Sequence, residues 1–168
     1  LNLLKDVSSE IRVLDPSRPS DGPGGAWAAT LLDACPPLHD VNAYAVDDED
    51  AEASDGGAGD DFWLVATGFT TPTTLMRGTL ERTSDGTPGV VSRHAVVKAS
   101  PSFFADADYE VQQHFAVSED GTRVPYFQVA PRNLALDGQN PTQLSGYGGF
   151  EVSRTRAYSG TVGRAGLE

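Results

Sequence analysis

The apolar residues of this chain recur mostly at every second position or in short continuous runs, and turn-forming residues separate the runs. This spacing is typical of β-strands, whereas an amphipathic helix repeats its apolar face every three to four residues. The clearest runs are IRVL (11–14), VNAYAV (41–46), FWLVATGF (62–69), TLMRGTL (74–80) and VVSRHAVV (90–97). The pattern predicts a mainly β fold with antiparallel strands, as in propeller blades or sandwiches.

The stretch YEVQQHFAVSEDGTRVPYFQVA (109–130) predicts a β-hairpin. One face of its first arm carries Tyr109, Val111, Phe115 and Val117, and the other carries Glu110, Gln112, His114 and Ser118. Asp120 and Gly121 form a dipeptide that strongly favours a tight hairpin turn. Pro125 has no backbone N–H, so we expect the second arm to lie at a sheet edge or to carry a bulge.

The charge balance limits the partners that suit this chain. It has 24 acidic and 12 basic residues, for a net charge of -12 at pH 7. Such a charge repels phosphate backbones and anionic lipid surfaces, so we expect neither nucleic acid nor a membrane as a partner. No apolar run approaches the roughly 18 to 20 residues of a membrane-spanning helix. The single cysteine, Cys35, cannot form an intrachain disulfide, and we predict a soluble, cytoplasmic protein.

The possible metal ligands do not have the spacing of a known site. The loop DDEDAEASDGGAGDD (47–61) holds eight carboxylates, but it does not fit the calcium-binding loop pattern, so a solvated loop is favoured over a calcium site. His39, His94 and His114 are scattered and have no partner residues at a zinc-binding spacing. We therefore predict no metal and no cofactor. Nothing near Cys35 clearly activates its thiol, which favours a structural role.

The segment LSGYGGFEVS (144–153) is unusual because Gly146, Gly148 and Gly149 surround Tyr147 where the flanking apolar residues favour a strand. Glycine costs a strand roughly 0.5 to 1 kcal/mol relative to alanine, so these glycines indicate a positive φ or the close approach of another group. No G-x-S-x-G motif, phosphate-binding loop or G-x-G-x-x-G motif accompanies them. From the residues alone, a packed or hydrogen-bonded Tyr147 is favoured over a catalytic one, and both readings stay open.

Longer stretches of the sequence resemble the prolyl oligopeptidase family of serine peptidases. The stretches HFAVSEDGTRVPYFQVA, LDGQNPTQLSGYGGFEVS and AYSGTVGRAGLE resemble the join between the propeller and the catalytic domain of that family. FWLVATGFTTPTTLMRGTL resembles its last propeller strands, and SPSFFADADYEVQQHF resembles the passage into the catalytic domain. The resemblance covers residues 41–168, and more loosely residues 1–32.

The resemblance implies a seven-bladed β-propeller that covers an α/β-hydrolase domain and an enzyme that cleaves short peptides, typically after proline and in some members after basic residues. Residues 1–104 would be the C-terminal part of the propeller, and residues 105–168 the first strands of the hydrolase domain, with a crossover at 101–108. In this reading Tyr147 is an oxyanion-hole donor, and Phe150 lines the pocket for the residue before the scissile bond.

The resemblance also implies that this chain is a segment of a longer protein. Its partners would be short peptide substrates and the remainder of its own propeller and catalytic domains. In α/β-hydrolases the nucleophile, the acid and the histidine follow the early oxyanion loop, so we expect the segment to lack the Ser/Asp/His triad and to be inactive by itself. The alternative is a non-catalytic, all-β binding module or a pseudoenzyme.

Overall fold

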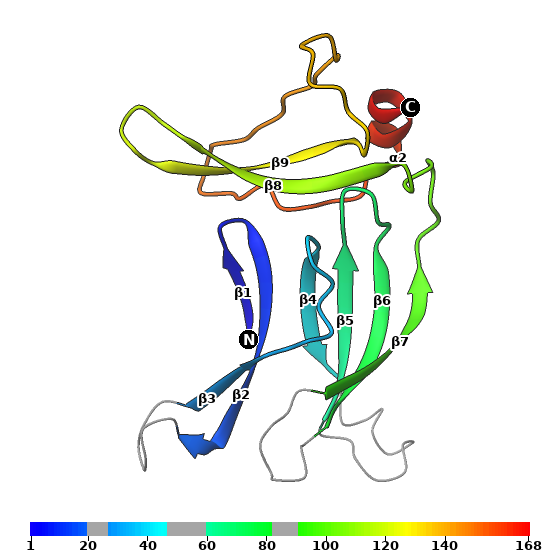
Figure 1. Cartoon of the computed structure of the whole chain (residues 1–168). Coiled ribbons are helices and arrows are strands. Elements are labelled where there is room, and N and C mark those ends of the chain that lie inside the picture. Colours follow the sequence, from blue (N-terminus) through cyan, green and yellow to red (C-terminus); the bar gives the residue numbers. More distant parts are fainter. Residues whose placement is uncertain (20–26, 47–59, 82–90) are drawn as a thin grey trace.

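The computed structural model describes residues 1–19, 27–46, 60–81 and 91–168, which form antiparallel β-sheets followed by a short C-terminal helix (Figure 1). The first sheet contains β1 (Asn2–Lys5), β2 (Ser8–Pro19) and β3 (Trp27–Leu31). The second contains β4 (Asp40–Ala45), β5 (Asp61–Thr67), β6 (Thr74–Glu81) and β7 (Val91–Ala99). The third is the hairpin β8 (Tyr109–Val117) and β9 (Arg123–Pro131). The helix consists of α2 (Gly160–Val162) and the wider turn η1 (Gly163–Leu167).

The described parts of the period-two runs lie largely in β2, β4, β5, β6 and β7, which confirms the mainly β prediction. The sequence pattern did not indicate β1 and β3. Strands β1 and β2 are joined by a two-residue turn at Asp6 and Val7, whose φ angles are 49° and 55°. Such turns usually contain glycine or asparagine, and a β-branched residue rarely adopts a positive φ, so the sequence carries no ordinary signal for this hairpin.

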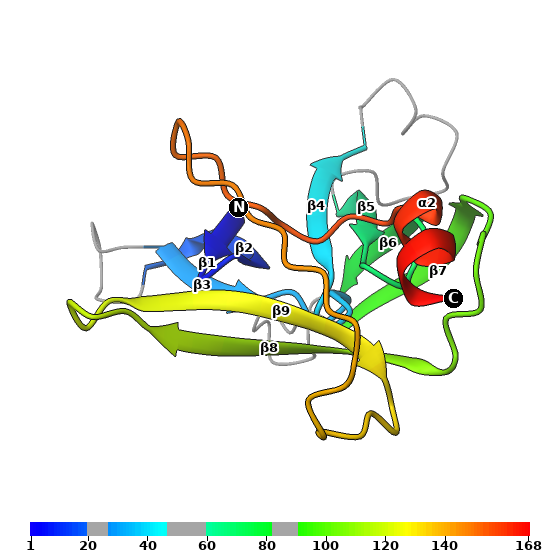
Figure 2. The same cartoon turned by 90° about the horizontal axis from the view of Figure 1, so that it is seen from above.

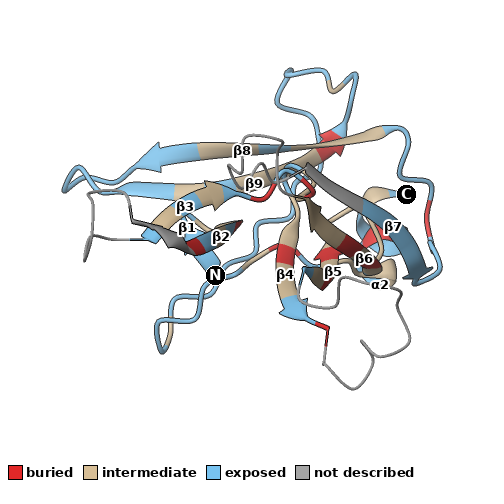
Figure 3. Cartoon of the chain, turned by 90° about the horizontal axis from the view of Figure 1, so that it is seen from below, coloured by how far each residue is buried: buried red, intermediate tan, exposed pale blue. Residues whose placement is uncertain are grey.

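The hydrophobic core lies between the first and second sheets. Successive residues of β5 alternate between buried and half-buried, with Phe62, Leu64 and Ala66 on the buried side. They form one cluster with Ile11 of β2 and Met76 of β6, together with Leu32, Ala34 and Val41. Figure 3 shows buried positions in the second sheet, whereas the turn end of β8 is exposed. The period-two pattern of apolar residues in the sequence therefore matches the alternation of buried and half-buried residues along β5.

Polar contacts join the facing edges of the same two sheets. The side-chain amide of Asn2 on β1 donates to the carbonyl of Ala43 on β4 (3.2 Å) and accepts from its N–H (3.0 Å). The hydroxyl of Ser9 on β2 donates to the carboxylate of Asp40 at 2.5 Å. Asn2 thus pairs both backbone groups of Ala43 at the edge of β4, where no strand continues the sheet within the described residues.

The hairpin of β8 and β9 is confirmed, and it lies across the ends of the other two sheets (Figure 1). Its register is regular, with Phe115 opposite Pro125, so the edge position predicted for Pro125 is confirmed and no bulge forms there. The apolar face of β8 is only partly covered: Tyr109 and Val111 are half-buried, whereas Phe115 and Val117 are exposed.

Beyond β9, residues 132–159 contain no strand or helix. Figure 2 shows this orange stretch as a long excursion that passes beyond the first sheet and returns to the C-terminal helix. The helix packs on the linker that follows β7, where the rings of Phe104 and Tyr158 stack at 5.3 Å. Within the described ranges, none of the helices has the length and apolar character to cross a membrane.

Candidate functional site

The segment 144–153, called the glycine-rich segment below, is irregular rather than strand-like. The strand predicted at its flanks is wrong, because a strand needs a neighbour for its backbone hydrogen bonds and the described residues offer none there. Tyr147 is 51% exposed, and Phe150 is almost fully exposed. Across residues 1–19, 27–46, 60–81 and 91–168, the hydroxyl of Tyr147 has no hydrogen-bond partner, so this donor is available to another molecule.

The positive φ angles predicted for glycines of this segment lie instead at Phe150 and Glu151, each with a φ of 55°. These two residues form the centre of a turn in which the N–H of Val152 donates to the carbonyl of Gly149 at 3.2 Å. The expectation of a close approach holds only at Gly149. A β-carbon there would lie 3.1 Å from the Tyr147 hydroxyl oxygen, whereas the space beside Gly146 and Gly148 is open.

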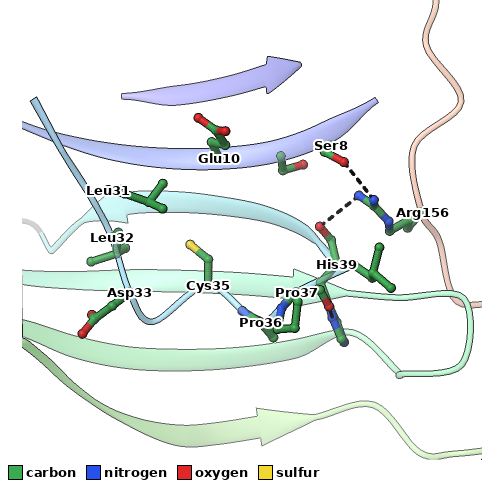
Figure 4. A pocket seen from close by; sticks show the side chains of 12 residues that line it. Ser8, Glu10, Leu31, Leu32, Asp33, Cys35, Pro36, Pro37, His39 and Arg156 are labelled. Carbon is green, nitrogen blue, oxygen red and sulfur yellow. Dashed lines mark hydrogen bonds between the residues drawn. The ribbon is translucent and has the colours of Figure 1, made fainter. Parts of the chain in front are cut away.

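A pocket of about 250 Å3 lies elsewhere, between β2, the end of β3, the loop of residues 32–39 and Arg156 (Figure 4). Neither Tyr147 nor Phe150 lines it. Cys35 lies in its wall, and burial raises the pKa of this thiol, with the nearby charge of Asp33 acting in the same direction. A raised pKa keeps the thiol protonated, and the thiol is then a poor nucleophile, which agrees with the structural role expected for Cys35.

Arg156 closes one end of this pocket and is only 2% exposed. Its Nη1 donates to the carbonyls of Val7 (3.3 Å) and His39 (3.4 Å), and its Nη2 donates to the Ser8 hydroxyl (3.0 Å). The guanidinium also lies over the ring of Phe127 on β9, 4.3 Å from the ring centroid. Burial lowers the pKa of the Arg156 guanidinium, and the charge of Asp40 partly opposes this effect.

Nothing in the sequence singles out Arg156, which stands with Arg154 in an otherwise ordinary polar stretch. Its bonding partners are far away in the sequence, at Val7, Ser8 and His39. A periodic pattern reports only local structure, so it cannot reveal such a contact. The sole available signal was an arginine within the stretch that resembles a catalytic domain, which is too weak to identify a buried charge.

The three histidines do not come together. His39 places Nδ1 2.8 Å from the carbonyl oxygen of Pro37. His114 packs against the ring of Tyr126 at 5.3 Å, and His94 is exposed on β7. In the described part of the chain, no three His, Cys, Asp or Glu side chains form a group that could hold a metal. The acidic stretch 47–59 lies outside the described residues.

Comparison with known proteins shows similarity along the whole chain. No protein-family profile matches it. Over 168 residues it is 33% identical to the uncharacterized peptidase y4nA of Sinorhizobium fredii, of which it covers 20%. It is 29% identical over 164 residues to the prolyl endopeptidase of Elizabethkingia miricola, a match that covers 92% of this chain and 22% of that protein.

Comparison with solved structures also points to peptidases. A prolyl endopeptidase structure, solved in work on inter-domain dynamics, superimposes with a TM-score of 0.68 at 28% identity, over 96% of this chain and 20% of that one. The mainly β architecture agrees with the propeller part of such enzymes. This chain spans about a fifth of the length of these relatives. Its curated and structural neighbours are therefore peptidases of the prolyl oligopeptidase family, and this chain corresponds to a part of them.

Proposed function

We propose that this chain is part of a serine peptidase of the prolyl oligopeptidase type that cleaves short peptides after proline. Residues 1–104 are the C-terminal part of its β-propeller, and residues 105–168 are the first part of its α/β-hydrolase domain. The observation that carries the proposal is the similarity to peptidases over all 168 residues, together with the fold match to a prolyl endopeptidase.

In this proposal the Ser/Asp/His triad is supplied by residues outside this chain. The serine hydroxyl attacks the scissile carbonyl, the histidine takes its proton, and the carbonyl oxygen gains negative charge. The hydroxyl of Tyr147 donates a hydrogen bond to that oxygen as the charge develops. Its half-exposed position, without an internal partner among the described residues, supports this role.

Phe150 supplies a flat apolar surface for the residue before the scissile bond, and a proline ring fits such a surface. The side chain of Phe150 is exposed, so it is accessible to a substrate. Glycines at positions 146 and 148 leave open space on either side of Tyr147, where a peptide backbone can approach.

A fluorophosphonate probe tests the proposal directly, because it reacts with activated serine nucleophiles. We expect labelling of the longer protein and none of the 168-residue chain. Labelling of the short chain would contradict the placement of the nucleophile outside it. If the longer protein is neither labelled nor active, the chain belongs instead to a binding module or a pseudoenzyme.

Specificity is tested with two short chromogenic peptides that differ only in the residue before the scissile bond. Proline at that position should give the higher kcat/KM, and arginine the lower. The reverse order would keep the peptidase assignment but overturn the preference for proline.

A further inference from the structure

After the glycine-rich segment, Arg156 is the first residue of the described structure that forms hydrogen bonds with the sheets and the loop before β4. In the ranges that the structure describes, the hydrogen bonds of residues 135–155 stay inside that stretch, such as Asn140 to the carbonyl of Ala135 and Val152 to that of Gly149. Arg132 holds the start of the excursion through the carbonyls of Ala107 and Asp108. Arg156 therefore holds the other end.

The site that receives Arg156 is the strained turn between β1 and β2. Arg156 donates to the carbonyl of Val7 and to Ser8, whose hydroxyl donates in turn to Gln113 of β8 at 3.0 Å. The amide of Gln113 donates to the carbonyl of Asp6 at 2.8 Å. Left-handed backbone at non-glycine residues costs roughly 1 to 2 kcal/mol per residue, so contacts around this turn are needed to hold it.

The contact uses features that only arginine provides. Two nitrogens of the guanidinium donate three hydrogen bonds, and its central carbon lies over the ring of Phe127. No carboxylate lies within ion-pair distance of it in the described residues, so its charge is met by carbonyl dipoles and by the more distant Asp40. A lysine could donate from a single nitrogen only and could not stack a planar cation.

We propose that Arg156 is a positioning residue for the glycine-rich segment. By docking in the turn between β1 and β2 (Figure 4) and on Phe127, it fixes the end of the excursion (Figure 2). The place of Tyr147 and Phe150 relative to the sheets is thereby fixed as well. This inference rests on the proposed function, because the position of Tyr147 affects a rate only if its hydroxyl acts in catalysis.

The first test measures the position of the segment without any assay of activity. In the longer protein, chymotrypsin should cut after Phe150 several-fold faster in Arg156→Met and in Arg156→Lys than in the wild type. Arg154→Met is the matched control, because Arg154 is exposed and only two residues away. Equal cleavage rates in the wild type and both Arg156 variants would overturn the proposal.

The second test is a double-mutant cycle between Arg156 and Tyr147. Misplacing a catalytic group by about 1 Å can lower a rate on the order of 100-fold, so Arg156→Met should lower kcat about 10- to 100-fold when Tyr147 is present. In the Tyr147→Phe background the same change should lower kcat much less, because the group it positions is gone. A residue that merely stabilises the fold would lower kcat by the same factor in both backgrounds, which would overturn the proposal.

The two tests separate this inference from the proposed function. If Tyr147→Phe leaves kcat unchanged, the oxyanion role of Tyr147 fails, and the cleavage after Phe150 alone decides the role of Arg156. Full activity of Arg156→Lys would show that charge suffices without the planar donor geometry, and it would count against positioning by the guanidinium.

Discussion

The ring of Phe104 occupies the space that a side chain at Gly163 would need. A β-carbon at position 163 would lie 2.0 Å from Cδ1 of Phe104, far inside contact distance. Phe104 is buried, and it stacks on Tyr158, whose hydroxyl accepts a hydrogen bond from the N–H of Phe103 at 2.7 Å. The absence of a side chain at position 163 therefore lets the C-terminal helix dock on the linker after β7.

Gly163→Ala should release this docking, although alanine normally favours a helix over glycine by about 1 kcal/mol. We expect faster hydrogen exchange at the amides of Phe103 and Ala105, the second of which donates to the Glu168 carboxylate. Gly166→Ala is the control, because a β-carbon there meets its nearest neighbour at an ordinary 3.6 Å. Equal exchange rates in the two variants would show that the ring of Phe104 can move aside at little cost.

Leu64→Ala should weaken the core between the first two sheets. Leu64 has 0% of its surface exposed and lies in the middle of β5. Removing a buried leucine side chain typically costs 2 to 5 kcal/mol, so we expect a loss of about that size in the free energy of unfolding, measured with urea. Leu136→Ala, at a position that is 90% exposed, should change it by less than about 0.5 kcal/mol. Similar losses in both variants would contradict the core described here.

The hairpin turn between β8 and β9 should weaken in acid. Hydrogen bonds from the Ser118 hydroxyl and from the Thr122 N–H lower the pKa of Asp120 to about 2. The usual value in an unfolded chain is about 3.9, so the stabilisation is complete above pH ~4 and is lost as the pH falls towards about 2. Hydrogen exchange at the hairpin amides, corrected for its intrinsic pH dependence, should therefore speed up in this range.

Two variants test the source of that acid dependence. Ser118→Ala removes the largest cause of the low pKa in the folded chain, so the loss of protection should be smaller and should be complete at a higher pH. Asp120→Asn keeps an oxygen acceptor without a titrating group, and its hairpin should show no such transition between pH 4 and 2. A transition that persists in Asp120→Asn would have to come from another carboxylate.

The second sheet could be predicted from the sequence because its strands carry their own pattern. In β5 each second residue faces the core, and the sequence alternates with the same period. The hairpin of β8 and β9 was predictable for the same reason, with Asp120 and Gly121 at its turn. Strand β1 was missed because Asp6 and Val7 hold positive φ angles through contacts with Gln113 and Arg156, which are distant in the sequence.

The candidate site was predictable only through resemblance to a family. Periodicity gives no role to Tyr147 or Phe150, and it placed a strand where the structure has an irregular segment. The left-handed residues turned out to be Phe150 and Glu151 rather than the glycines. Arg156 was missed altogether, because its burial depends on carbonyls of Val7 and His39 that only the folded chain brings to it.

Tyr147→Phe tests the candidate oxyanion donor in the longer protein. The change removes one hydroxyl and keeps the ring, so it should leave the fold and KM nearly unchanged. Loss of one oxyanion-hole donor typically lowers kcat by about 10² to 10³, and we expect a loss in that range with a short proline-containing peptide. Tyr126→Phe is the matched control, because Tyr126 is 46% exposed, lies on β9 and has no part in the proposed chemistry. Equal kcat values for the two variants would return Tyr147 to a packing role and leave the oxyanion donor to be sought among residues outside this chain.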